Sequence, residues 1–228
     1  MATDAGTIAS TGRVRATPHR AALLLLVMSI GAIASPGPLA AGSLSYDGQP
    51  PQAVCGLCHG LGGVSPMAKF PSLAGQKAAY IEKQLADFAA GRRTNDGGQM
   101  SSIVTEISAD QLPVVAQYFS GLPAPKPSSA DGQTAAMVKA RHIYERGKPA
   151  AGVPACVTCH AGAAAAAPLA PHLAAQHARY LRKQLSDFAA GVRTNDPAAT
   201  MRRIASKLTA AEIEALSIYI ASLPRKGV

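Results

Sequence analysis

Two copies of the pattern Cys-x-x-Cys-His, at residues 55–59 and 156–160, constrain this 228-residue chain more than any other feature. On one turn of helix, two cysteines three residues apart point the same way, so each thiol can bond one former vinyl group of a porphyrin. The adjacent histidine then offers an imidazole nitrogen to the iron. The two copies use all four cysteines of the chain, so the pattern predicts two covalently bound c-type haems. The predicted attachment residues are Cys55, Cys58, Cys156 and Cys159, and the predicted iron ligands on this side are His59 and His160.

Two other uses of paired cysteines remain open from the pattern alone. A redox dithiol also contains Cys-x-x-Cys, although it does not need a histidine after both copies. A structural zinc site could use both cysteine pairs, provided that all its ligands meet in one place.

Residues 1–41 have the composition of an export signal. Three arginines precede an apolar run of 13 residues at 21–33, which is too short to span a bilayer unless it is extended. Small residues follow, and they place the predicted cleavage between residues 34 and 42. Because c-type haem is attached outside the cytoplasm, the expected location is the periplasm. An uncleaved membrane anchor is the alternative.

The remaining chain is an internal repeat with a period near 100 residues. Gln84–Gly91 (QLADFAAG) returns as Gln184–Gly191 (QLSDFAAG), and Arg-Thr-Asn-Asp follows soon after both. A period of this length exceeds that of a solenoid unit and indicates two duplicated domains. A Pro/Ser-rich segment lies between them. The predicted boundaries are 42–123 for the N-terminal haem domain, 124–132 for the linker and 133–228 for the C-terminal haem domain.

Both domains are predicted to be all helix. Gln76–Ala90 places apolar side chains on one face and ends at Gly91, a natural C-cap, and the second copy repeats this pattern. Ser108 and Thr209 look like helix N-termini, and Thr209 fits a capping box. No alternating strand pattern appears in the sequence. We therefore predict an all-α fold with a haem in the middle of each domain.

A haem iron that only carries electrons needs a sixth ligand, and two methionines are the candidates. Met201 is the one methionine after His160, and Met100 is its counterpart in the first copy. Both follow the repeated Arg-Thr-Asn-Asp, so a loop can carry each methionine over the opposite face of the haem. Thioether ligation favours reduced iron and raises the potential. The alternative is that both methionines fill the core.

The other histidines and methionines lack a matching residue in the opposite copy. Met67 and Met137 are therefore expected to pack in the core. We expect His142, His172 and His177 to be surface groups or satisfied core groups. Two histidine ligands on the second haem, through His172 or His177, are the alternative.

On these residues, the chain after its signal resembles the dihaem cytochrome c4 family, which is built of two class I cytochrome c domains. The matching stretches are CxxCHG, PSLAGQ, YIEKQLADFAAGRRTND with Met100, and LPVVAQYF, then GVPACVTCH, YLRKQLSDFAAGVRTND with Met201, and EIEALSIYI. The resemblance implies two tandem domains, each wrapped round a covalent haem, with propionates facing each other across the domain interface. It also implies His59/Met100 and His160/Met201 ligation.

The resemblance implies periplasmic electron transfer to or from respiratory complexes. We expect a soluble monomer that is not an enzyme, with a haem-copper terminal oxidase or a quinol-cytochrome c reductase as its redox partner. The alternative is a dihaem relay subunit of a periplasmic dehydrogenase for sulfide or alcohol. A dihaem peroxidase is a third class, and it would need one five-coordinate iron.

The second half departs from the family pattern after its motif. A run of alanines follows Gly162, and Ala175 replaces the glycine of LAGQ. Because an alanine that must adopt positive φ is strained, we expect the second haem loop to follow a different path. The leading helix of the first domain is expected to be short, because Pro50 and Pro51 stand just before Cys55.

Charge is distributed unevenly along the chain. Residues 42–126 hold six basic and six acidic groups, whereas residues 127–228 hold 13 basic and six acidic groups. Arg202 and Arg203 directly follow Met201. This basic half is expected to steer toward an acidic redox partner or an anionic membrane surface, and a merely solvated surface is the alternative. Nucleic acid is not expected as a partner for an exported haem protein, despite the net charge of +9.

Overall fold

The computed structural model describes residues 48–130, 134–161 and 167–225, which belong to one compact unit. The predicted export signal and its cleavage site lie outside the described residues. Within the described ranges the chain is helical, apart from turns, coil and one isolated bridge between Lys148 and Val153. The predicted all-α fold is confirmed.

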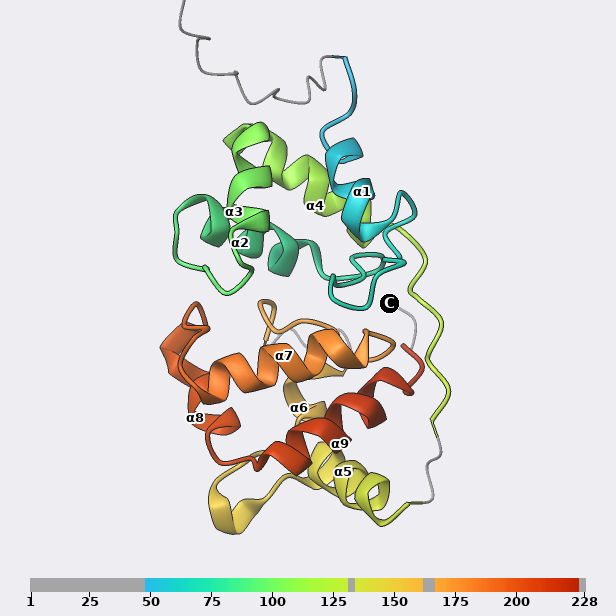
Figure 1. Ribbon diagram of the computed structural model, residues 1–228, viewed down its shortest axis with the longest axis vertical. Helices are drawn as coiled ribbons and strands as arrows, with labels where there is room; N and C mark the ends of the chain where they lie inside the picture. Colours follow the sequence, from blue (N-terminus) through green and yellow to red (C-terminus); the bar gives the residue numbers. More distant parts are fainter. Residues whose placement is uncertain (1–47, 131–133, 162–166, 226–228) are drawn as a thin grey trace, which may run out of the picture. The chain divides into compact units, whose positions relative to one another are not determined.

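The first half is built from helices that begin and end where local signals predict. Among its described residues these are α1 (Ala53–His59), α2 (Ala78–Ala89), α3 (Gln99–Ile103) and α4 (Leu112–Ser120) (Figure 1). Gly91 takes a φ of +65° just after α2, as a glycine beyond a helix end should. A capping box between Ser108 and Gln111 starts the short 3₁₀ turn that leads into α4. α1 is only seven residues long, as the proline pair before it predicts.

The second half repeats this order and adds a helix in front. Its helices are α5 (Ala135–Arg146), α6 (Val157–His160), α7 (Ala178–Ala189), α8 (Thr200–Ala205) and α9 (Ala210–Ala221) (Figure 1). α9 packs against both α5 and α7, while α8 packs against α7. The predicted capping box is present. The Thr209 hydroxyl accepts the backbone N–H of Glu212, and the Glu212 carboxylate accepts the backbone N–H of Thr209. Pairing of α7 with α9 mirrors the pairing of α2 with α4 in the first half.

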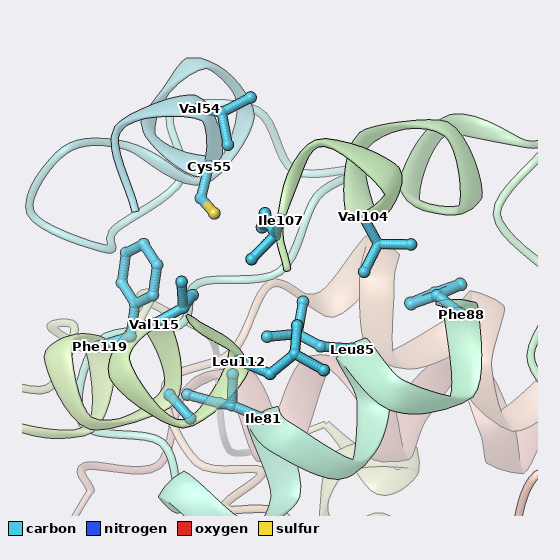
Figure 2. Close-up of a cluster of buried hydrophobic side chains, with 11 residues drawn as sticks. Val54, Cys55, Ile81, Leu85, Phe88, Val104, Ile107, Leu112, Val115 and Phe119 are labelled. Carbon is cyan, nitrogen blue, oxygen red and sulfur yellow. The ribbon is translucent and has the colours of Figure 1, made fainter. Parts of the chain in front are cut away.

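Each half has its own apolar core. In the first, α2 contributes Ile81, Leu85 and Phe88 to a buried cluster to which α4 contributes Val115 and Phe119 (Figure 2). Full burial of a side chain of this size stabilises the fold by about 1.5–3 kcal/mol. The second core gathers buried side chains from α5, α7 and α9, namely Ala140, Ile143, Tyr144, Leu181, Leu216, Ile220 and Ala221. Two separate cores are what a duplicated chain should build.

The turn that contains Ala175 corrects one prediction. Ala175 takes a φ of +56°, close to the +63° of its counterpart Gly75. The same backbone bond closes both turns, from Gln76 to Leu73 and from Gln176 to Leu173. At this turn the second half therefore keeps the path of the first, and the alanine accepts the strain instead of avoiding it. The alanine run at 162–166 lies outside the described residues.

Across the part of the chain that the structure describes, no helix combines the length and the apolar character that crossing a membrane requires.

Candidate haem sites

The first motif lies on α1 and faces the first core. The Cys55 side chain is 5% exposed, and its sulfur points from α1 toward the region between Ile107 and Phe119 (Figure 2). Burial raises the pKa of the Cys55 thiol to about 11. Cys58, one turn further on, is half-buried, and both cysteines are free. Two free thiols on one helical face are what thioether attachment of a porphyrin requires.

The His59 ring is oriented by a hydrogen bond to the backbone. Its Nδ1 lies 2.8 Å from the carbonyl oxygen of Pro71. Because a carbonyl oxygen only accepts, Nδ1 carries the proton and donates it, which leaves the lone pair of Nε2 free. Burial also lowers the pKa of His59 below its usual value, so the ring is neutral. A neutral imidazole with a fixed tautomer is the form that binds iron.

Glycine is required immediately after this histidine. Gly60 caps α1 with a φ of +78°, and an added Cβ would lie 2.2 Å from the carbonyl oxygen of Val64. The loop then closes through the carbonyl of Gly63, which accepts the N–H groups of Leu73 and Ala74 at 2.7 and 3.0 Å. These bonds bring the segment that holds Pro71 back beside the motif helix.

The second motif repeats this histidine geometry on the shorter helix α6. His160 Nδ1 lies 2.8 Å from the carbonyl oxygen of Pro171, so Nε2 is again left free. Burial again lowers the histidine pKa. Cys156 is half-buried and Cys159 is exposed, and both are free. Burial raises the pKa of the Cys156 thiol to about 11. Both motifs therefore fit a covalently attached haem.

Met100 stands near the start of α3, at the end of a segment that we call the Met100 loop (residues 93–100). It is half-buried and packs against the first core, which also contains Cys55. The Asp96 carboxylate accepts the backbone N–H groups of Met100 at 2.5 Å and Ser101 at 3.1 Å. This acidic cap fixes the first turn of the helix that carries the methionine.

Met201 occupies the matching place in the Met201 loop (residues 193–201). It is half-buried near the start of α8. Asp196 here accepts the backbone N–H of Arg202 at 3.0 Å and its Nε at 2.8 Å. Ala198 and Ala199 hold left-handed backbone angles just before the helix, with φ of +52° and +54°. Among its described members the second core contains Cys156 but not Met201.

The remaining histidines lie where the sequence predicts. His142 is exposed on α5. His172 is 8% exposed, and burial together with nearby cations lowers its pKa to about 4, so the ring is neutral. His177 Nε2 lies 3.0 Å from the carbonyl oxygen of Ser65.

Of the two methionines that were predicted to pack in the core, only Met137 does so. Met137 is 5% exposed and packs in the interior, as expected. Met67 is 38% exposed, so the prediction that it fills the core is wrong. The Ser65 hydroxyl bonds both the backbone N–H and the carbonyl of Met67, and the resulting tight turn leaves the methionine side chain at the surface.

Sequence reasoning assigned no role to four polar residues that the structure buries. Gln84 and Gln184 are each 8% exposed, and Arg93 and Arg193 are 6% and 5% exposed. The signal that could have found them is that the same polar residues recur at the same positions in both copies, on or beside apolar helices.

Comparison with known proteins agrees with this geometry. The family model described as Cytochrome c matches residues 144–224. The chain is 41% identical to cytochrome c4 of Pseudomonas aeruginosa over 179 residues, which covers 77% of this chain and 87% of the relative. It is 34% identical to the thiosulfate dehydrogenase electron acceptor of Thiomonas intermedia over 209 residues, covering 88% and 91%. The crystal structure of reduced recombinant cytochrome c4 from Pseudomonas stutzeri superposes with a TM-score of 0.67 at 39% identity, covering 76% of this chain and 95% of that one.

A helical chain with this pair of sites is a c-type cytochrome, an electron carrier with two haems. Its two covalently bound c-type haems are attached at Cys55 and Cys58 and at Cys156 and Cys159, which rules out the dithiol and zinc alternatives. The chain belongs to the cytochrome c4 family.

Proposed function

We propose that this chain is a soluble periplasmic carrier that passes electrons between respiratory complexes. The observation that best supports this proposal is the matched pair of neutral histidines, each held by a proline carbonyl beside its own attachment motif. Each bound haem iron supplies a one-electron couple. The chain supplies two thiol anchors and an oriented imidazole at each site, with apolar side chains around Cys55 and Cys156.

The proposed axial ligand sets are His59/Met100 and His160/Met201. Two observations support the methionines: each stands near the start of a helix fixed by an aspartate, and Met100 packs against the core of Cys55. Thioether ligation stabilises reduced iron, and two protein ligands leave no open position for a substrate.

Replacement of each methionine tests the ligand sets. Met100→Ala and Met201→Ala should each remove about half of the sulfur-to-iron charge-transfer absorption of the oxidised protein and lower one of the two potentials. Met67→Ala is the matched control, because its exposed side chain should affect neither. A variant that keeps the whole band and both potentials would show that its methionine only packs.

We also propose the domain limits 42–123 and 133–228, with a linker at 124–132 and an export signal at 1–41. Separate cores within the two ranges support the division. N-terminal sequencing of the exported protein should find a start between residues 35 and 42. Sedimentation at micromolar concentration should show a monomer. A start at residue 1 would mean that the signal is retained as an anchor.

The proposed electron acceptor is a haem-copper terminal oxidase, with a quinol-cytochrome c reductase as donor. A second candidate is a relay for a dehydrogenase. It is favoured by the similarity to the thiosulfate dehydrogenase electron acceptor of Thiomonas intermedia. Both candidates use the same two haems, so only the partner separates them.

A kinetic experiment with both partners separates the candidates. Reduced dihaem protein is mixed with oxidase-containing membranes, and oxidised protein is mixed with a thiosulfate dehydrogenase plus thiosulfate. We expect rapid, cyanide-sensitive oxidation by the membranes. Slow oxidation there together with rapid reduction by the dehydrogenase would replace the first candidate with the second.

The proposed docking face lies on the basic second half. Arg179 and Arg203 are exposed, whereas Arg202 is paired with Asp196 at 2.8 Å. Steering by exposed charge speeds encounter with an acidic partner or an anionic membrane surface and weakens as salt screens it. Arg93 of the first half does not belong to an exposed charged surface, because it is buried between the two halves.

A further inference from the structure

Each Met loop is bonded to a helix of the opposite half. The carbonyl oxygen of Asn95, in the Met100 loop, accepts Lys183 Nζ at 2.8 Å. The Asn95 side-chain nitrogen donates to Asp187 Oδ2 at 2.5 Å and to Gln184 Oε1 at 3.1 Å. All three partners lie on α7, so one face of that helix fixes both the backbone and the side chain of this residue.

The mirror-image contacts are present on the Met201 loop. The carbonyl oxygen of Asn195 accepts Lys83 Nζ at 2.8 Å. Its side-chain nitrogen donates to Asp87 Oδ2 at 2.7 Å and to Gln84 Oε1 at 3.0 Å. These three partners lie on α2. The same three bonds are thus made twice, once in each direction across the halves.

Two buried arginines bind the same helices together. Gln84 Oε1 accepts Arg93 Nη1 at 2.8 Å and Arg193 Nη2 at 2.9 Å. Gln184 Oε1 accepts Arg193 Nη1 at 2.8 Å and Arg93 Nη2 at 3.0 Å. Each glutamine oxygen is therefore shared by an arginine from each half. We call this set of bonds between α2, α7 and the two Met loops the seam.

The seam is continuous with the helices that carry the methionines. Asn95, held by α7, is followed directly by Asp96, whose carboxylate caps the Met100 N–H at 2.5 Å. Asn195, held by α2, is followed by Asp196, which fixes Arg202 beside Met201. Because the two residues are covalently adjacent, a shift of the asparagine also moves the backbone of the aspartate that orients the methionine helix.

We propose that the polar face of each seam helix positions the axial methionine of the other half. Lys183, Gln184 and Asp187 are positioning residues for Met100. Lys83, Gln84 and Asp87 are positioning residues for Met201. The inference rests on the proposed methionine ligation. It adds that the stability of each iron–sulfur bond depends on the opposite half of the chain.

Two lysine substitutions test the crossed dependence in the full dihaem protein. Lys183→Met and Lys83→Met keep the apolar stem and remove the ammonium, which donates to the opposite asparagine carbonyl and also pairs with Asp187 or Asp87 on its own helix. The readouts are the methyl resonances of the iron-bound methionines in the reduced protein and the rate at which imidazole displaces each methionine in the oxidised protein. Met100→Ala and Met201→Ala assign each signal to its haem.

We expect Lys183→Met to shift the Met100 methyl resonance and to speed imidazole exchange at the first haem by about fivefold, the loss expected for one partly exposed charged hydrogen bond. The second haem should be unchanged. Lys83→Met should do the reverse. Lys183→Arg, which keeps a donor, should restore slow exchange.

Arg182→Met is the matched control on the same helix. Its guanidinium pairs with Glu214 of its own half at 2.9 Å, and its loss should change neither haem. If each lysine variant affects only its own half, or neither, the crossed positioning is overturned while ligation stands. If the unsubstituted protein lacks two assignable methionine signals, the ligation itself fails, and the inference fails with it.

Discussion

Two consecutive alanines in left-handed conformation strain the loop that leads to Met201. Ala198 and Ala199 have φ of +52° and +54°, where the first half has Gly97 and Gly98 at +70° and +83°. A non-glycine residue in this region costs about 1–2 kcal/mol. Glycine loses more conformational entropy on folding than alanine does, which costs about 0.5–1 kcal/mol per residue. Ala198 is exposed and Ala199 half-buried, so little apolar burial is at stake. Ala198→Gly with Ala199→Gly should therefore raise the free energy of unfolding by about 1–2 kcal/mol.

The reciprocal change in the first half is the matched control. Gly97→Ala with Gly98→Ala should lower the free energy of unfolding by a similar amount. An added Cβ at either position meets no atom within 4 Å, so backbone strain alone acts. The assay is equilibrium unfolding in guanidinium chloride, followed by far-ultraviolet circular dichroism on the oxidised dihaem protein. The midpoints are compared only where the slope m is unchanged.

Either of two results would refute this reasoning. If the double glycine variant unfolds at the same or a lower denaturant concentration with an unchanged slope, the left-handed alanines carry no net strain. If Gly97→Ala with Gly98→Ala leaves the midpoint unchanged, alanine pays no conformational penalty in this left-handed turn. Opposite shifts of similar size in the two halves would confirm it.

Three further predictions address packing, pH and docking. Gly63→Ala should destabilise the first half by about 2–4 kcal/mol in the same assay, because its φ is +71° and an added Cβ would meet backbone and ring atoms at 2.9–3.0 Å. The pKa of Glu212 is lowered from 4.5 to about 2, by its capping bond and by ion pairs that include Lys148, against the cost of burial. Stability from this carboxylate is thus present above pH 4.5 and lost as the pH falls toward 2; Glu212→Gln should remove about 1–2 kcal/mol of that dependence. Arg203→Glu should slow electron exchange with the partner by about two- to fivefold at low salt, measured by stopped flow.

Each of these has its own control. Gly91 has positive φ but open space around it, so Gly91→Ala should cost less than Gly63→Ala, and an equal cost would exclude the steric contribution. A Glu212→Gln protein that loses stability below pH 4.5 as steeply as the parent would place the titration elsewhere. For docking, Lys69→Glu reverses an exposed charge of the first half. A larger loss from Lys69→Glu, or no salt dependence, would contradict docking through the second half.

Local rules account for most of what the sequence predicted correctly. The predicted helix Gln76–Ala90 appears as Ala78–Ala89, because the 3.6-residue spacing of apolar side chains and the glycine at 91 are both encoded within the segment. The capping box at Thr209 is likewise local. The motif spacing was enough to predict both haem attachments, since it reflects chemistry on a single helical turn.

What the sequence did not predict depends on partners distant in the chain. The bonds of Arg93 to Tyr180 and Gln184 join residues that are 87 and 91 positions apart, and no local pattern specifies such pairs. No local feature of the sequence therefore distinguishes Arg93 from an exposed surface charge. The prediction of a different backbone path at Ala175 was wrong for another reason. A general preference for glycine was taken as a requirement, whereas the surrounding turn keeps an alanine in the same conformation.

The seam is arranged like an isologous dimer interface, although it lies within one chain. Each contact between a residue of one half and a residue of the other is repeated with the two halves exchanged. In a true homodimer, any substitution would alter both copies of such a contact at once. Here, Gln84 can change while Gln184 stays, so one of the two equivalent contacts survives. Tandem fusion thus lets the two halves diverge, one neutral and one basic, one with a glycine pair before its methionine and the other with alanines, while they keep a symmetric junction.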